Sequence, residues 1–246
     1  FPPIMSIGLE DFVAGFQEAI RPDYPLMSQF GMARFQMVFQ AGPGTPEMMP
    51  PGASPLQSTR GYRIDTADHQ WRLFLTPDFL ALETSKYDDR DGFMTRLRKA
   101  FHALGDHIGP AHTSRLGVRY IDRIGGEPLK QISSFFNSEL LGLFHDPIQR
   151  QNVIQLLSEA QFVIPEGRMA ARWGLLPENA STDPSAIEPR PEPTWIMDLD
   201  AYHEELVAFD ADKLVMEARK LSERSYTFFR WAVREEFLTY FKESRP

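Results

Sequence analysis

Apolar and polar side chains alternate most regularly at residues 113–124 of the chain. In a β-strand, alternate residues point to the same face of the sheet. Four apolar residues would then share one face: Leu116, Val118, Tyr120 and Ile124. Three arginines would share the opposite face: Arg115, Arg119 and Arg123. The pattern predicts a strand with one face in a hydrophobic core and the other face able to attract anions.

Residues before this strand alternate between strand and helix patterns. Helical spacing of apolar residues predicts helices at 6–20 and 93–108, the second capped by Asp91 and ended by Gly109-Pro110. Period-two alternation predicts strands at 32–40, 61–65, 69–76 and 78–84. A Pro- and Gly-rich segment at 41–59 is predicted to be a long surface loop.

Residues after the strand repeat this plan less regularly. The pattern predicts a helix at 129–144, strands at 153–164, 167–175 and 195–200, and a long helix from about 210 to 243. A second proline-rich loop is predicted at 176–193. We therefore expect an α+β fold of two loosely similar halves, each a mostly antiparallel sheet with a helix packed on one face, closed by the long C-terminal helix. The expected organisation is a single domain, 1–246, of two subdomains at about 1–125 and 126–246.

Composition narrows the possible classes of protein. The chain of 246 residues carries a net charge of -8, which argues against broad, non-specific binding of nucleic acid. It contains no cysteine, so disulfides and thiolate metal sites are excluded. Since no apolar run reaches the ~18–20 residues that span a bilayer, and no signal-peptide pattern is present, we expect a cytoplasmic protein without membrane contact.

The arginine face has two interpretations. Asp198 and Asp200 are spaced like the arginines on the polar side of their own strand, which favours cross-strand ion pairs. In the alternative, Arg115, Arg119 and Arg123 bind a phosphorylated or carboxylated small molecule, with Asp198, Asp200 or His203 assisting. Gly117 lies among the arginines and favours a β-bulge over a close backbone approach.

Motifs for catalysis or cofactors are not found in the sequence. It has no GxGxxG, GxxxxGK[ST], HExxH or GxSxG pattern. His102 and His107 are five residues apart, a spacing that does not place two ligands on one metal ion. We expect no catalytic residues, no metal and no cofactor, although the anion-binding alternative includes an enzyme or a sensor.

The C-terminal helix combines aromatic and basic residues. Arg224, Arg230, Trp231 and Arg234 form a candidate interaction surface. Burial of the aromatic stripe within the protein or in a helix–helix dimer fits this composition better than nucleic-acid binding. We expect a homodimer or another protein partner.

The central strand also resembles a known group. Thr113 to Ile124, together with Phe1-Pro-Pro-Ile4, Tyr24-Pro25 and Ile196 to Asp200, is similar to a sporadically distributed bacterial family of uncharacterised proteins. The chain departs from that family where Met5 leads almost directly into a helix and where Leu221-Ser222 replaces a Leu-His pair. The resemblance implies bacterial origin and an accessory role, such as a defence or toxin–antitoxin-type module. The resulting expectation is a binding or regulatory protein that acts through protein contacts.

Overall fold

The computed structural model describes residues 1–32, 59–146, 148 and 151–243. The chain forms two compact units: residues 1–114 with 206–212, and residues 115–205 with 213–246. The first boundary differs from the predicted division at 125/126. Residues 116–125 pair with a strand at 194–203, which places them in the second unit.

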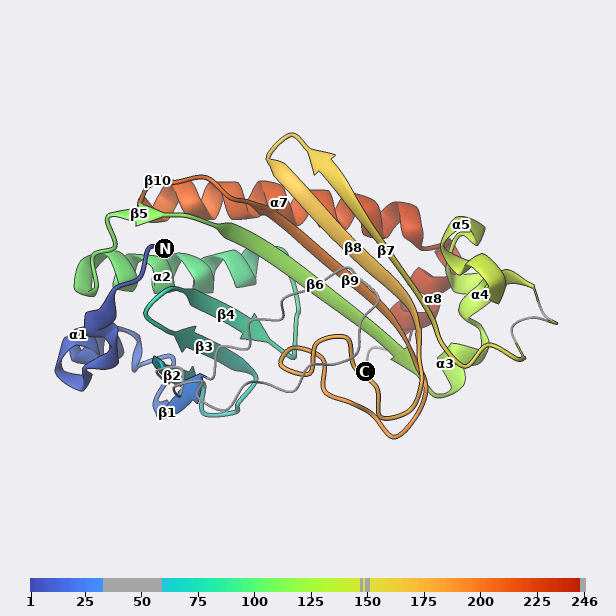
Figure 1. Ribbon diagram of the computed structural model, residues 1–246, viewed down its shortest axis with the longest axis horizontal. Coiled ribbons are helices and arrows are strands. Elements are labelled where there is room, and N and C mark those ends of the chain that lie inside the picture. Colours follow the sequence, from blue (N-terminus) through green and yellow to red (C-terminus); the bar gives the residue numbers. More distant parts are fainter. Residues whose placement is uncertain (33–58, 147, 149–150, 244–246) are drawn as a thin grey trace, which may run out of the picture. The chain divides into compact units, whose positions relative to one another are not determined.

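The first unit contains a four-stranded antiparallel sheet and two main helices (Figure 1). Its helical elements are η1 (Met5–Gly8), α1 (Glu10–Ile20) and α2 (Arg90–His107). Its sheet has the order β1 (Leu26–Met32), β2 (Thr59–Asp65), β3 (Trp71–Leu75) and β4 (Leu80–Thr84). A short ribbon pairs β5 (His112–Thr113) with β10 (Val207–Ala208). The predicted strand at 32–40 coincides with β1 only at Met32; residues 33–40, like 41–58 of the predicted loop, lie outside the described residues.

Helices α1 and α2 pack against one face of this sheet. Phe16 of α1 and Leu104 of α2 are buried in one cluster with Tyr62, Ile64 and Leu73 of the strands. The helix α2 begins earlier than predicted, because the side chain of Asp89 accepts a hydrogen bond of 2.7 Å from the backbone N–H of Gly92. Asp89 is therefore the N-cap, and the prediction of Asp91 was wrong.

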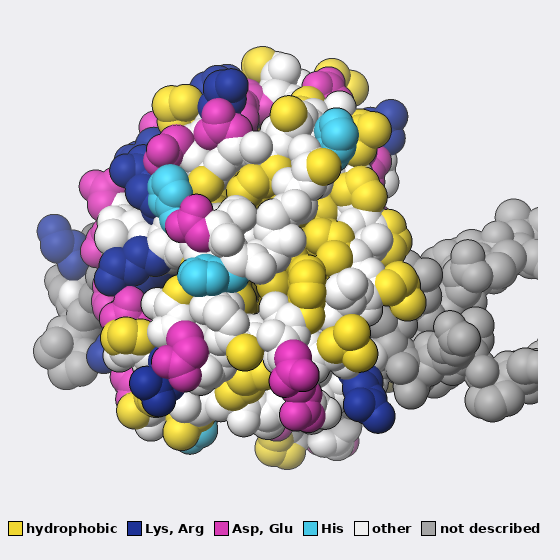
Figure 2. Space-filling view, turned by 90° about the vertical axis from the view of Figure 1, so that its left-hand side faces the viewer, with side chains coloured by type: hydrophobic (Ala, Val, Ile, Leu, Met, Phe, Trp, Pro, Cys, Tyr) yellow, Lys and Arg dark blue, Asp and Glu magenta, His cyan; other side chains and the backbone are white. Residues whose placement is uncertain are grey.

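The first unit carries charges of both signs on its surface. Figure 2 looks onto the side on which α1 and the β5–β10 ribbon lie in Figure 1, and it shows hydrophobic side chains gathered beside basic and acidic ones. Met5, Leu9 and Leu206 are among the exposed hydrophobic residues of this unit. On the visible face, Lys and Arg side chains are interspersed with Asp and Glu side chains.

The second unit contains another four-stranded antiparallel sheet. Its order is β6 (Leu116–Gly125), β9 (Thr194–His203), β8 (Gly167–Leu176) and β7 (Leu156–Ile164). The helical elements described in this unit include α3 (Glu127–Lys130), α4 (Ile132–Phe135), α5 (Ser138–Leu141), η2 (Gly142–His145), α7 (Ala211–Ala232) and α8 (Glu235–Glu243). Trp195, Met197 and Leu199 of β9 are buried in one cluster with residues of these helices, including Phe135 and Phe237. The predicted α+β class, with antiparallel sheets and a C-terminal helix, is confirmed.

Two predicted helices are interrupted where they meet. The helix predicted at 129–144 is a series of short pieces, because Phe136 is extended and Gly142 has a φ of 52°. The helix predicted at 210–243 breaks between α7 and α8 at Val233, which forms a β-bridge with Phe136. Arg234 N–H also donates a bond of 2.8 Å to the carbonyl of Phe135. Hydrogen bonds between the two segments thus end both helices.

A helix that spans a bilayer must be both long and apolar. No helix in the described residues meets both requirements.

Candidate functional site

The arginine face belongs to the sheet of the second unit. Strand β6 pairs with β9 so that Arg119 lies opposite Asp200 and Ile121 lies opposite Asp198. Because directly opposite residues share a face, the arginines and both aspartates project from the same side of the sheet. The structure therefore brings together Arg115, Arg119, Arg123, Asp198 and Asp200, as the sequence predicted.

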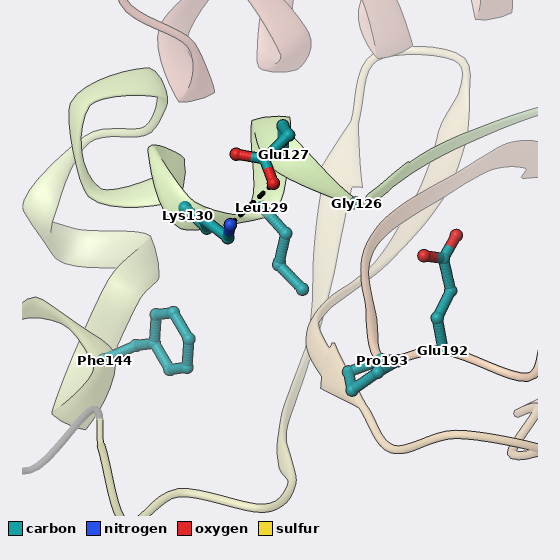
Figure 3. Close-up of a pocket in the computed structure, with 7 residues that line it drawn as sticks. All are labelled: Gly126, Glu127, Leu129, Lys130, Phe144, Glu192 and Pro193. Carbon is teal, nitrogen blue, oxygen red and sulfur yellow. Dashed lines mark hydrogen bonds and ion pairs between the residues drawn. The ribbon is translucent and has the colours of Figure 1, made fainter.

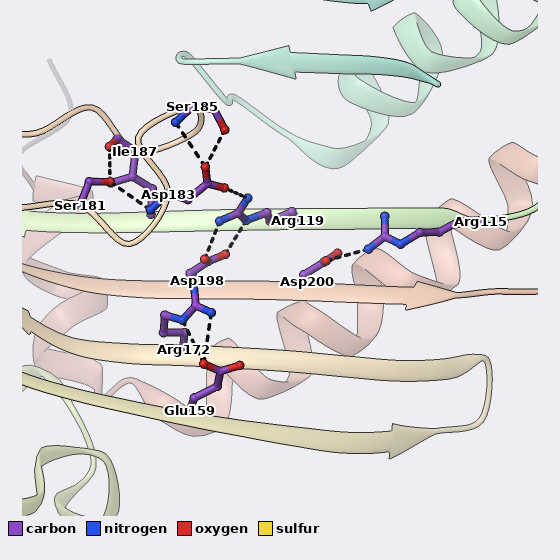
Figure 4. Close-up of polar contacts among 10 residues, drawn as sticks. All are labelled: Arg115, Arg119, Glu159, Arg172, Ser181, Asp183, Ser185, Ile187, Asp198 and Asp200. Carbon is purple, nitrogen blue, oxygen red and sulfur yellow. Dashed lines mark hydrogen bonds and ion pairs between the residues drawn. The ribbon is translucent and has the colours of Figure 1, made fainter. Parts of the chain in front are cut away.

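Arg119 is at the centre of the polar network (Figure 4). Its Nε and Nη2 each donate a bond of 2.7 Å to the two carboxylate oxygens of Asp198, and its Nη1 donates another of 2.7 Å to Asp183 Oδ2. The side chain of Asp198 is 6% exposed, against 31% for Arg119. The predicted ion pair between Arg119 and the 195–200 strand is confirmed, and a second aspartate completes it.

The charges of this network stabilise one another. The hydrogen bond to Asp198 raises the pKa of Arg119, with a smaller contribution from Asp183. Burial alone would raise the pKa of Asp183, but hydrogen bonds from Ser185 and Arg119 together lower it. Asp200 differs, since burial raises its pKa and Arg115 offsets only part of that rise. The guanidinium of Arg119 is thus held charged between the carboxyl groups of Asp198 and Asp183.

Residues 177–193 form the loop that supplies Asp183. Ser181 Oγ donates to the carbonyl of Ile187 at 2.5 Å, and Ser185 Oγ donates to Asp183 Oδ1 at 2.6 Å. Ile187 is 3% exposed. The loop is therefore tied to itself and anchored to the sheet through the bond between Asp183 and Arg119 (Figure 4).

Arg115 is held between a carboxylate and an aromatic ring. Its Nη2 donates to Asp200 Oδ2 at 2.8 Å, and its guanidinium carbon lies 4.7 Å from the centre of the Tyr202 ring. Gly117 pairs with Tyr202 in regular register, so the predicted β-bulge was wrong. A Cβ at Gly117 would lie 2.9 Å from Arg115 Nη1. The glycine leaves room for the guanidinium to lie over the ring.

Arg123 has two nitrogens bonded to internal acceptors and a third, buried nitrogen without one. Its Nε donates to Thr194 Oγ1 at 3.0 Å, and its Nη1 donates to the carbonyl oxygen of Glu188. Its Nη2 is buried and has no hydrogen-bond partner in the described part of the chain. Burial lowers the pKa of Arg123, and the nearby charge of Arg190 lowers it further. A buried donor of this kind can donate a hydrogen bond to an anion.

His203 is separated from the other predicted site residues. It lies opposite Leu116 in the register, on the apolar side of the sheet, whereas Asp198 and Asp200 are on the polar side. Its Nδ1 is buried and finds no hydrogen-bond partner among the residues that the structure describes. The structure therefore does not group His203 with the two aspartates.

The apolar side of β6 also holds a carboxyl group that sequence reasoning missed. Asp122 lies opposite Met197, two residues after Tyr120, whose hydroxyl is 2.7 Å from Ser222 Oγ of α7. Burial raises the pKa of Asp122 to about 6. A signal was present in the sequence, because Asp122 has the same parity as Tyr120 and Ile124 in the alternating pattern.

A cavity of about 450 Å³ lies elsewhere in the second unit (Figure 3). Its lining residues are Gly126, Glu127, Leu129, Lys130, Phe144, Glu192 and Pro193. Lys130 Nζ is paired with Glu127 at 2.6 Å. None of the lining residues was predicted as a site residue. No group of three or more metal-ligating side chains occurs in residues 1–32, 59–146, 148 and 151–243.

The basic residues predicted as an interaction surface on the C-terminal helices have different environments. Arg224 donates two bonds of 2.8 Å to Glu166 in the turn between β7 and β8. Arg230 pairs with Glu235 at 3.1 Å, and Arg234 is exposed. Glu166 is 10% exposed, and its hydrogen bonds from Arg224 lower its pKa. Arg224 therefore clamps the β7–β8 hairpin against α7.

An aromatic row connects α7 with the outer strand of the sheet. The ring of Phe228 lies 5.5 Å from Phe162 of β7, 5.3 Å from Trp231 and 6.4 Å from Trp173 of β8. Phe162 is 38% exposed and Trp231 is 50% exposed. These aromatic side chains therefore continue from the sheet edge onto the solvent side of the helix.

Comparisons with protein-family models, with curated proteins and with solved structures found no match to this chain.

Proposed function

We propose that this protein is a binding or regulatory protein that acts through protein contacts and has no catalysis of its own. The observation that carries the proposal is the exposed apolar surface formed by β7 and its neighbouring aromatic residues. We call this the β7 surface and define it as Leu157, Phe162, Val163, Phe228 and Trp231. Four of these side chains are between 38% and 92% exposed, and Phe228 is partly buried between them.

The arginine face supports the same proposal because its strongest donors already bind internal acceptors. Arg119 uses three of its nitrogens on Asp198 and Asp183, and Arg115 bonds to Asp200. A ligand at Arg119 would have to displace an ion pair whose carboxylate is nearly fully buried. The wider role that we propose, a cytoplasmic bacterial accessory module of the defence or toxin–antitoxin type, rests on the family resemblance of the central strand.

A photo-crosslinking experiment tests the proposed function. Benzoylphenylalanine is placed at Val163, which is 92% exposed, in cells that make the protein, and cross-linked products are identified by mass spectrometry. The matched control places it at Met216, a 54% exposed residue of α7. We expect a specific protein cross-link at position 163 only. Equal amounts of cross-linked product from both positions, or no cross-linked product from position 163, would contradict a role in protein binding.

Arg123 favours a second function, the binding of a small anion. Its buried Nη2 has no acceptor in the described part of the chain, and Arg190 is close enough to lower its pKa. Titration calorimetry with inorganic phosphate tests this function. We expect binding that Arg123→Ala abolishes and Arg115→Ala retains, because Arg115 is already engaged by Asp200. Absence of phosphate binding to the unmodified protein contradicts the anion-binding function for this ligand.

A further inference from the structure

The β7 strand ends the sheet without the usual protection of an edge. In the described part of the chain, β7 hydrogen-bonds to β8 alone. Its nine residues, Leu-Leu-Ser-Glu-Ala-Gln-Phe-Val-Ile, include no proline, glycine or lysine and a single charge. Soluble proteins commonly protect edge strands with charged residues, prolines or bulges. An edge of this length and composition is therefore a template for pairing with another strand.

The exposed side chains lie on both faces of the edge. Val163 and Leu157, at 92% and 39% exposed, project on the same side as the arginine row. Phe162 projects on the side of α7 and contacts Phe228. A partner strand added at β7 would therefore cover apolar groups both above and below the sheet.

We propose that the occupant of this edge is a second copy of the same chain, with two β7 strands paired antiparallel about a twofold axis at Ala160. This inference rests on the proposed function and names the partner of the β7 surface. In that register Leu156 faces Ile164, Leu157 faces Val163, Ser158 faces Phe162, and Glu159 faces Gln161. Each opposing pair lies on one face of the sheet, as antiparallel pairing requires.

Charge is also compatible with self-pairing. The one charged residue of β7, Glu159, faces Gln161 and not its own copy in this register, and its carboxylate already binds Arg172 Nη2 at 3.1 Å. The pairing therefore joins Leu156 with Ile164 and Leu157 with Val163, and it places no two like charges directly opposite each other. If the twofold axis lay one residue nearer the C-terminus, at Gln161, Glu159 of one copy would face Val163 of the other.

The aromatic row adds a second contact to the strand pairing. A twofold axis perpendicular to the sheet keeps the α7 helices of both copies on the same side of the joined sheet. Phe162 and Phe228 of each copy then flank the new ladder, with Trp231 beside them. Aromatic side chains of this kind are enriched at the centres of protein interfaces.

The β7 surface is held in place before any partner binds. Glu166, in the short turn that follows β7, accepts two bonds of 2.8 Å from Arg224 of α7. Strand β7 is also paired along its whole length with β8. Little conformational freedom remains to be lost when a second copy binds, which favours association.

Analytical ultracentrifugation of charge-substituted variants tests the dimer and its register. We expect the unmodified protein to sediment as a dimer at micromolar concentrations. V163K and L157E should each weaken dimerisation at least tenfold, because each buries a charge opposite an apolar residue. The double variant L157E/V163K places the introduced opposite charges against one another at both symmetric positions, so it should recover the dimer. M216K, which adds the same charge on an exposed part of α7, should leave the dimer unchanged.

A monomer at all concentrations overturns the dimer. A dimer that V163K and L157E leave intact, or that the double variant does not recover, overturns this interface. The crosslinking experiment separates these failures from failure of the proposed function. Cross-links from position 163 to a different protein alone would retain protein binding and reject self-pairing. Thermal unfolding of every variant verifies that the monomer is folded.

Discussion

Substitution of Asp122 by asparagine tests whether the folded second unit raises the pKa of this carboxyl. The Asp122 side chain projects from β6 to the side on which Tyr120 contacts Ser222 of α7. Ser225, one turn farther along α7, is also buried and its hydroxyl has no hydrogen-bond partner in the residues described. Burial raises the pKa of Asp122 from 3.8 to about 6, so the folded protein holds this proton more tightly than the unfolded chain.

The size and sign of the effect follow from the two pKa values. Between pH 3.8 and about 6 the folded state binds more protons at Asp122 than the unfolded state, so stability is lost as pH rises through this window. A pKa difference of roughly 2 units corresponds to at most about 3 kcal/mol above the window. Asparagine has a similar shape and does not ionise. The unfolding free energy of Asp122→Asn minus that of the unmodified protein should therefore be about 1.5 kcal/mol larger at pH 8 than at pH 5.

Urea denaturation of both proteins at pH 5 and pH 8 measures this difference. Other titrating groups are common to the two proteins, so their contributions cancel in the comparison. A difference in unfolding free energy that is the same at both pH values would refute the assignment of Asp122 as a partly buried carboxyl whose pKa is raised in the folded state. A larger relative gain at pH 5 would reverse the predicted sign and refute it equally.

Three further substitutions test the polar network, the hairpin clamp and a glycine. Arg119→Ala should lower the unfolding free energy by about 3 kcal/mol, because it leaves the buried Asp198 without its ion-pair partner. The control Arg115→Ala should lower it by less than about 1 kcal/mol. Equal losses of the two variants in urea denaturation would contradict this prediction. Arg224→Ala should accelerate hydrogen exchange at the β7–β8 turn, and unchanged exchange would show that the clamp is unnecessary. Gly174→Ala should lower the unfolding free energy by at least about 3 kcal/mol, because φ is 141° and a Cβ would overlap the carbonyl oxygen of Leu156. Gly8→Ala is the control, since a Cβ at Gly8 would have no neighbouring atom within 4 Å. Similar losses for the two variants in thermal or urea unfolding would contradict this prediction.

The arginine strand could be predicted because its signal is local. One face of β6 packs in the core, and burial alone imposes a period of two on the sequence. It could also be predicted that aspartates of another strand pair with these arginines, because Asp198 and Asp200 are spaced two residues apart on one face of their own strand. The exact pairs could not, since Arg119 lies opposite Asp200 in the backbone register and yet its side chain reaches Asp198.

Features set by distant contacts could not be predicted. Phe136 and Val233 interrupt two helical patterns because the segments bond to each other across nearly a hundred residues of sequence. Asp183 lies in a proline-rich loop without periodicity, so no pattern indicated that it would reach Arg119. The exposed edge of β7 depends on the strand order of the sheet, which is also a property of the whole fold.

Disulfide trapping at Ala160 tests the central claim, that the protein acts through the β7 surface and pairs there with itself. The chain contains no cysteine, so Ala160→Cys introduces a single thiol. In the proposed register the two copies of residue 160 face each other with Cα atoms about 4.5–5.5 Å apart, which a disulfide can bridge. We predict rapid formation of a covalent dimer on mild oxidation and none for the control Met216→Cys. Equal, slow cross-linking of both variants would contradict the claim.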